Sequence, residues 1–100
     1  MTGKLDVIIA GGGRVGFQTA QILADQGHDV TIVERDERVV SEIADEWLAT
    51  VIRGDATNPE IIEQAGVEDA DVIAALTGET GLNLAVCLAA SELAGDIRTV

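Results

Sequence analysis

Residues 5–16 read LDVIIAGGGRVG, an apolar run followed at once by a glycine-rich turn. Residues 5–10 predict a buried strand, and a helix is expected to begin near Arg14. Glycines at 11, 13 and 16 complete a G-x-G-x-x-G pattern between the two elements. In this context Gly11 permits a tight turn, Gly13 lets a pyrophosphate approach the backbone, and Gly16 lets the helix pack closely on the strand. The stretch therefore predicts the first βα unit of a dinucleotide-binding domain, with phosphate held at the helix N-terminus.

Short β-branched runs and longer helical segments alternate along the rest of the chain. This alternation is typical of α/β proteins, and we expect a Rossmann-type doubly wound parallel sheet of strand order 3-2-1-4-5. The expected strands are residues 5–10, 30–34, 50–53, 71–76 and 97–100, and the expected helices are 14–26, 36–47, one capped by Asn58 with Pro59 at its first position, and 82–94. Residues 1–100 are interpreted as one dinucleotide-binding domain, truncated before the sheet's last strand and taken from a longer protein.

Three of the helices make specific predictions about burial. The first is expected to stop at Gly27 and to bury Val15, Ala20, Leu23 and Ala24. The second carries an apolar stripe of Val39, Val40, Ile43, Ala44 and Trp47, with Trp47 in the core or an interface. The last is apolar on nearly every face, so packing on one sheet cannot bury it, and it predicts a self-association face.

The composition limits the possible partners. Eighteen acidic residues against six basic ones give a formal net charge of −12, and Lys4 is the only lysine. Nucleic acid is an unsuitable partner for such a surface. Scarce lysine and dispersed acids suggest a halophilic source. Cys87 is the only cysteine, lies in an apolar run and is interpreted as a buried hydrophobe, which fits a reducing compartment. The sequence shows no leader peptide and no membrane span, so we expect a soluble protein of the cytoplasm.

The second expected strand ends in Glu34, about twenty residues after the glycine turn, where a ribose-binding acid belongs. Its carboxylate can accept hydrogen bonds from both ribose hydroxyls and would repel a 2′-phosphate, so NAD(H) is favoured over NADP(H). Arg35 weakens that preference, because it can either stack on adenine or pair with a 2′-phosphate. Arg14 can pair with a pyrophosphate or a terminal phosphate, or it is a plain exposed helix residue.

Further candidates follow the third and fourth strands. Asp55 can accept a hydrogen bond from the adenine amino group, or it charges the next helix's N-terminus. Thr77 and Gly78 lie at the sheet's carboxyl edge and can border the second ribose or the nicotinamide. No ligand spacing for a metal is found.

The main alternative function is the cofactor half of an NAD-dependent dehydrogenase. That reading needs a proton donor, but the chain has no tyrosine, and His28 and Lys4 are expected at the wrong end of the sheet. A class I methyltransferase is a weaker alternative, because the glycine pattern and the neighbouring arginine fit it less well.

With these residues placed, the sequence resembles the RCK (KTN, TrkA-N) family, the N-terminal domain of Trk potassium-uptake regulatory proteins. The resemblance covers essentially the whole chain. It rests on GGGRVG at 11–16, VERD at 33–36, RGDATNPEIIEQAGVEDADVIAALTG at 53–78, and LN at 82–83. Gly81 departs from the family, which often has an acid in this stretch.

The resemblance implies a non-enzymatic, cytoplasmic regulatory subunit that binds NAD(H), or in sister systems ATP or ADP, and gates a membrane potassium transporter. It implies assembly as a homodimer or within a larger ring. The implied binding residues are Gly11, Gly13, Arg14 and Val15 around the phosphates, Glu34 at the adenosine ribose, Asp55, Ala56 and Thr57 at the adenine, and Thr77 and Asn83 at the distal end. Their neighbours Gly12, Arg35 and Gly78 complete the predicted set of cofactor-binding residues.

Overall fold

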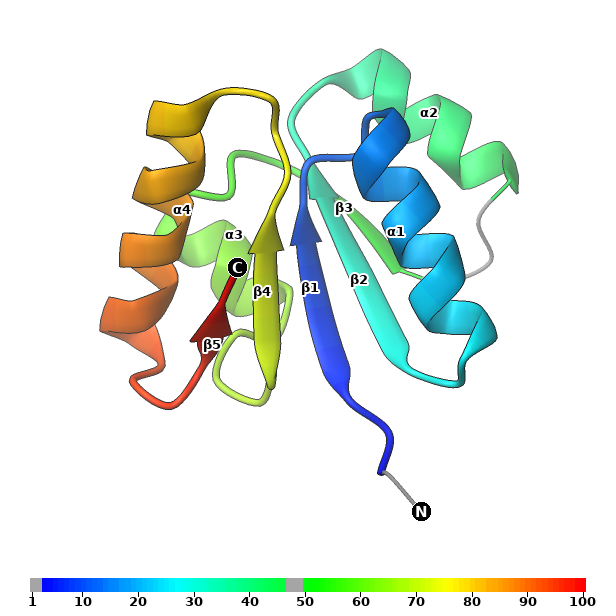
Figure 1. The fold of residues 1–100 in the computed structure, drawn as a ribbon. Helices are drawn as coiled ribbons and strands as arrows, with labels where there is room; N and C mark the ends of the chain where they lie inside the picture. The colour runs from blue at the N-terminus through cyan, green and yellow to red at the C-terminus, as the bar shows by residue number, and fades with distance from the viewer. Residues whose placement is uncertain (1–2, 47–49) are drawn as a thin grey trace.

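The computed structural model describes residues 3–46 and 50–100 of the chain. Within these residues, five strands and four helices alternate in sequence and form one sheet with helices on both faces (Figure 1). Their bounds are β1 Asp6–Ala10, α1 Arg14–Asp25, β2 Asp29–Glu34, α2 Glu37–Glu46, β3 Thr50–Arg53, α3 Pro59–Gln64, β4 Val72–Ala75, α4 Thr80–Leu93 and β5 Arg98–Thr99. No helix within residues 3–46 and 50–100 is both long and apolar enough to cross a lipid bilayer.

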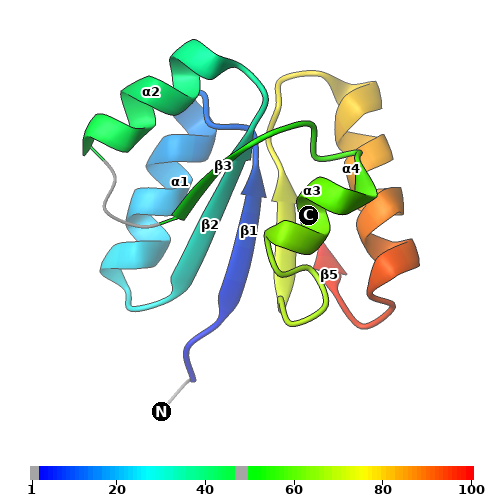
Figure 2. The ribbon, with the colours of Figure 1, turned by 180° about the vertical axis from the view of Figure 1, so that it is seen from behind.

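The sheet is parallel throughout and has the order β3-β2-β1-β4-β5, which confirms the predicted Rossmann-type topology. Each helix carries the chain from the carboxyl end of one strand back to the amino end of the next. All strands therefore have their carboxyl ends at the same edge of the sheet (Figures 1 and 2). The shortest strand is β5, yet its pairing continues to Val100, whose N–H donates to the Ile73 carbonyl at 3.0 Å.

Both faces of the sheet are buried, as the near-continuous apolar run of β1 predicts. Val7 and Ile9 of β1 face the layer formed by α1 and α2, where Ala20 and Ile43 complete the core. The alternating residues of β1 face α3 and α4 on the other side. That second core includes Ile8, Ala10, Ile62, Ile73, Val86 and Ala90.

The helix predictions are confirmed in outline and corrected in detail. Gly27 adopts φ +94° just after α1 and ends it as expected. The predicted burial of Val15 is wrong, because 62% of this residue is exposed. Ala44, placed on the apolar stripe of α2, is also exposed. Trp47 lies outside the described residues.

The last helix has the unsatisfied apolar face that its composition predicts. Val86 and Ala90 of α4 are fully buried, whereas Leu84 and Leu88 are 62% and 67% exposed. The helix begins at Thr80, two residues earlier than expected. Self-association through this face stays a prediction.

Candidate functional site

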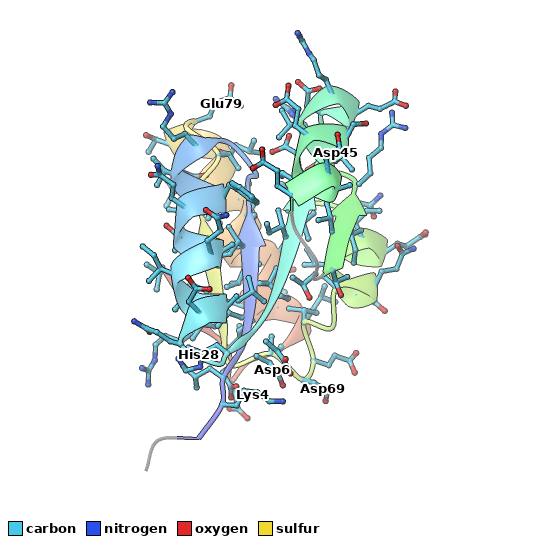
Figure 3. All side chains as sticks on the ribbon, turned by 90° about the vertical axis from the view of Figure 1, so that its right-hand side faces the viewer. Lys4, Asp6, His28, Asp45, Asp69 and Glu79 are labelled. Atoms are coloured by element: carbon cyan, nitrogen blue, oxygen red, sulfur yellow. The ribbon has the colours of Figure 1, made fainter. Side chains whose placement is uncertain are left out.

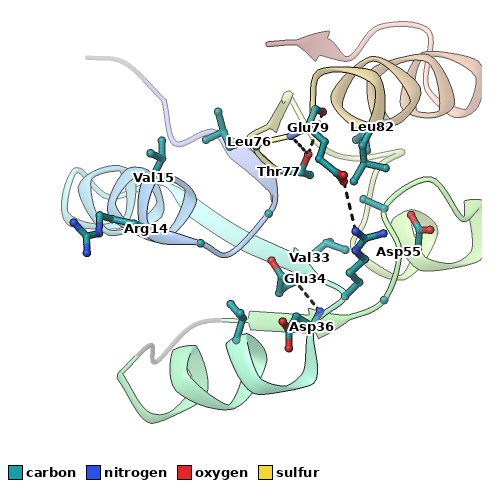
Figure 4. Close-up of a pocket in the computed structure, with 18 residues that line it drawn as sticks. Arg14, Val15, Val33, Glu34, Asp36, Asp55, Leu76, Thr77, Glu79 and Leu82 are labelled. Atoms are coloured by element: carbon teal, nitrogen blue, oxygen red, sulfur yellow. Dashed lines mark hydrogen bonds and ion pairs between the residues drawn. The ribbon is translucent and has the colours of Figure 1, made fainter.

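The carboxyl edge of the sheet carries a cleft of about 450 Å³ (Figure 4). It opens where β1 has β2 on one side and β4 on the other, which is the topological switch point at which open α/β sheets bind ligands. Ten of the predicted site residues line it, namely Gly11, Gly13, Arg14, Val15, Glu34, Arg35, Asp55, Ala56, Thr77 and Gly78. Val15, which was expected in the core, is thus one of the residues that line the cleft.

The glycine turn allows unusually close packing between β1 and α1. Gly11 has φ +113°, and a Cβ built on it would lie 2.6 Å from the carbonyl oxygen of Leu76. A Cβ on Gly16 would lie 1.9 Å from the carbonyl oxygen of Gly11. Any side chain at either position would therefore push on backbone atoms that cannot rotate away, as the pattern predicts for the turn and the helix–strand contact.

The N-terminus of α1 is left without a capping side chain. Its N-cap residue is Gly13, no acid lies in the first turn, and the first helical hydrogen bond runs from the Phe17 N–H to the Gly13 carbonyl at 2.8 Å. The amides before Phe17 have no acceptor within the helix. A Cβ on Gly13 would meet no atom within 4 Å, and Gly13 and Arg14 both line the cleft, so open space adjoins the start of the helix. The arrangement suits an anionic group near the positive end of the helix dipole.

The Glu34 carboxylate is held by two backbone amides. Its Oε1 accepts a hydrogen bond from the Gly12 N–H at 2.6 Å, and its Oε2 accepts one from the Asp36 N–H at 2.9 Å. Each oxygen has a second lone pair, so the carboxylate can still accept hydrogen bonds from the cleft. Gly12 itself is buried and is not part of the cleft lining; its amide contributes by orienting Glu34.

The β3–α3 turn orients Asp55 toward the cleft from the opposite wall. Its Oδ1 accepts hydrogen bonds from the Thr57 N–H at 2.9 Å and the Thr57 hydroxyl at 2.7 Å. These bonds hold the pKa of the Asp55 carboxyl below its ordinary value, against slight desolvation and with help from the charge of Arg35. Thr57 orients Asp55 and is not itself part of the cleft lining. The N-cap of α3 is Asn58, whose Oδ1 accepts a hydrogen bond from the Glu60 N–H.

The β4–α4 loop is fixed by Asn83. The Oδ1 of this residue accepts hydrogen bonds from the Thr77 N–H at 3.0 Å and from the Thr77 hydroxyl. Asn83 lies outside the cleft lining, so its contribution is to position Thr77.

Eight further residues line the cleft without having been predicted from the sequence: Val33, Asp36, Val39, Gly54, Leu76, Glu79, Leu82 and Val86. Glu79 is the most informative of them, because its Oε2 lies 3.5 Å from the Arg35 Nη2 across the cleft mouth (Figure 4). Its position shortly after β4 was the available signal, since side chains there reach the carboxyl edge.

The candidate proton donors lie at the other end of the molecule. Figure 3 shows His28 and Lys4 at the amino end of the sheet, opposite Glu79. The His28 Nδ1 accepts a hydrogen bond from the Leu5 N–H at 3.0 Å, and the Lys4 ammonium lies 3.2 Å from Asp29. Cys87 is half-buried. Among residues 3–46 and 50–100, no three His, Cys, Asp or Glu side chains are grouped so as to hold a metal ion.

A family model described as the TrkA-N domain matches residues 7–100. The Trk system potassium uptake protein TrkA homolog of Pyrococcus abyssi is 39% identical over 94 residues, which cover 94% of this chain and 41% of that protein. The chain therefore spans less than half the length of this relative.

Solved structures share the fold. The Kef CTD of Shewanella denitrificans in its AMP-bound form matches with a TM-score of 0.82 and 28% identity, covering 94% of this chain and 56% of that one. The GsuK channel bound to NAD matches with a TM-score of 0.78 over 92% of this chain and 17% of that one. At 18% identity, the second match shows the fold alone.

Proposed function

Since the chain belongs to the TrkA-N domain family, we propose that it is the nucleotide-sensing domain of a Trk-type potassium uptake system. Its ligand is NAD(H), with ATP or ADP as the alternative, and its output is the gating of a membrane potassium transporter. The observation that carries this proposal is the pairing of an uncapped helix N-terminus with an oriented carboxylate at the switch point of the sheet. These are the two groups that recognise a pyrophosphate and an adenosine ribose.

The cleft residues fit a dinucleotide from one end to the other. The pyrophosphate lies against the open space at Gly13 and the amides of the α1 N-terminus, with Arg14 beside it. Glu34 accepts hydrogen bonds from the adenosine ribose. Asp55 and the buried Ala56 border the adenine, and the Thr77–Gly78 turn borders the distal end of the ligand.

The cleft favours NAD(H) over more highly charged nucleotides. Four acids and two arginines line it, the acids being Glu34, Asp36, Asp55 and Glu79. A net negative lining penalises each additional phosphate charge on a ligand. The AMP in the Kef CTD structure, whose sequence is 28% identical, supports an adenine nucleotide as the ligand class.

Regulation rather than catalysis is proposed because the described part of the cleft wall contains no histidine, tyrosine or lysine beside a distal ligand end. A sensor needs only a difference in ligand affinity between two arrangements of the assembly. The transporter partner, the peripheral cytoplasmic location and assembly into a dimer or larger ring are part of this proposal, since the chain covers 41% of its Pyrococcus abyssi relative.

A charge placed at the phosphate position tests the proposal. Gly13→Asp adds a carboxylate in open space at the α1 N-terminus, where it competes with a phosphate. Gly81→Asp is the matched control, because Gly81 also has open space around its Cβ position, lies in the first turn of α4, and is outside the cleft lining. NADH titration should show binding to wild type and Gly81→Asp and at least a tenfold loss for Gly13→Asp. Equal NADH affinity in all three proteins would refute the proposed site.

A further inference from the structure

An ion pair crosses the mouth of the cleft. The Arg35 Nη2 lies 3.5 Å from the Glu79 Oε2, and the two residues come from the β2–α2 and β4–α4 connections on opposite walls (Figure 4). Both side chains also line the cleft. The Arg35 guanidinium is therefore already paired with the Glu79 carboxylate when a ligand enters the cleft.

Arg35 stands where a 2′-phosphate would be recognised. It directly follows Glu34, the acid proposed to bind the adenosine ribose, and an arginine near this acid is what accommodates the 2′-phosphate in Rossmann domains that bind NADP. A free guanidinium would bind such a phosphate through two parallel hydrogen bonds. Arg14, the other cation of the cleft lining, belongs to α1 at the pyrophosphate position.

We propose that Glu79 is a specificity-determining residue that disfavours 2′-phosphorylated dinucleotides by occupying Arg35. The inference rests on the proposed nucleotide-binding function of the cleft. NADPH has to displace Glu79 from Arg35 and then place its extra phosphate near that displaced carboxylate, whereas NADH requires neither. The effect adds to the repulsion that Glu34 itself exerts on a 2′-phosphate.

The effect is moderate in size because the pair is exposed. The Arg35 and Glu79 side chains are 61% and 64% exposed, and such pairs alter an equilibrium by about fivefold at most. Removing the repulsion between Glu79 and the phosphate adds to this, so we expect a total change of about three- to tenfold.

The test is the ratio of the NADPH and NADH dissociation constants, measured by calorimetry for wild type, Glu79→Gln and Glu63→Gln. Glu79 makes no side-chain cap bond at α4, so its replacement leaves the helix start intact. Glu63→Gln removes the same charge from an exposed position of α3 outside the cleft lining. The ratio should fall three- to tenfold in Glu79→Gln and stay constant in Glu63→Gln. In the double variant Arg35→Ala with Glu79→Gln the gain should vanish, because the phosphate needs the guanidinium.

An unchanged ratio in Glu79→Gln, an equal shift in Glu63→Gln, or a gain that persists without Arg35 would overturn the role of Glu79 while NADH binding still stands. A wild-type chain that binds neither nucleotide would overturn the proposed function, and this inference with it.

Discussion

Replacing Glu34 by alanine tests the centre of the cleft, because this carboxylate serves both the fold and the proposed ligand. Its two oxygens accept hydrogen bonds from the Gly12 and Asp36 amides at 2.6 and 2.9 Å. Gly12 is buried and its bond to Glu34 is partly buried, so its N–H would lose a charged acceptor at a place with limited access to water. Asp36 is exposed, and its amide can turn to water instead.

The expected magnitude follows from this difference. One buried donor left without an acceptor costs about 1–3 kcal/mol, and the exposed amide adds little. For a chain of this length, each kcal/mol lowers the melting temperature by about 4–8 °C. Loss of the charge-assisted bonds to the ribose should weaken NADH binding by about 1–3 kcal/mol, or roughly five- to 150-fold.

Two assays separate the two effects. Urea unfolding without nucleotide measures the loss of folding free energy, and NADH titration of the folded variant measures the loss of affinity. Glu63→Ala, an exposed α3 position outside the cleft lining, controls for the removal of one acid. Wild-type stability in Glu34→Ala would refute the structural role of the two amide bonds, and unchanged NADH affinity would remove Glu34 from the site.

Three further predictions follow from the turns and the charge. Gly16→Ala should lose about 3 kcal/mol or more of folding free energy, because its Cβ would lie 1.9 Å from the Gly11 carbonyl oxygen. Gly13→Ala meets no atom within 4 Å and should lose only about 1 kcal/mol in the same urea experiment, through the weaker N-cap preference of alanine; an equal loss in the two variants would contradict the packing role of Gly16. Asp55 has a pKa below its ordinary value of 3.8, so its stabilising effect is present above pH 3.8 and is lost as the pH falls through the lowered pKa. The difference in unfolding free energy between wild type and Asp55→Ala should therefore shrink as the pH falls below 3.8. A difference that stays constant with pH would contradict this role of Asp55. With a net charge of −12, the chain should melt at a higher temperature in molar KCl than in dilute buffer, and equal melting temperatures would argue against the halophilic origin suggested by its composition.

Much of the fold could be predicted because the deciding signals are local. The glycine pattern, the strand before it and the helix after it lie within residues 5–16, and each glycine has a steric reason that the structure bears out at Gly11 and Gly16. Glu34 was found for the same reason, since its distance from the turn follows from one βα unit. The strand order then follows from the Rossmann fold class that these signals indicate.

The contacts that the sequence did not reveal join residues far apart in the chain. The Arg35–Glu79 pair spans 44 positions, and the bond from the Gly12 amide to Glu34 depends on where β2 ends beside the turn. The burial of Val15 was mispredicted because helical periodicity fixes which residues share a face, while the angle at which α1 crosses the sheet decides which of them reach the core. The roles of Thr57 and Asn83 also depend on the folded turns. Each residue hydrogen-bonds a residue of the cleft lining while lying outside that lining itself.

The most direct measurement of the central claim is calorimetric titration of the purified chain in high potassium salt with NADH, NAD, NADPH, ATP, ADP and S-adenosylmethionine. The account predicts micromolar binding of NAD(H), weaker binding of NADPH, and no preference for S-adenosylmethionine. Binding of none of the six, or a preference for S-adenosylmethionine, would contradict it.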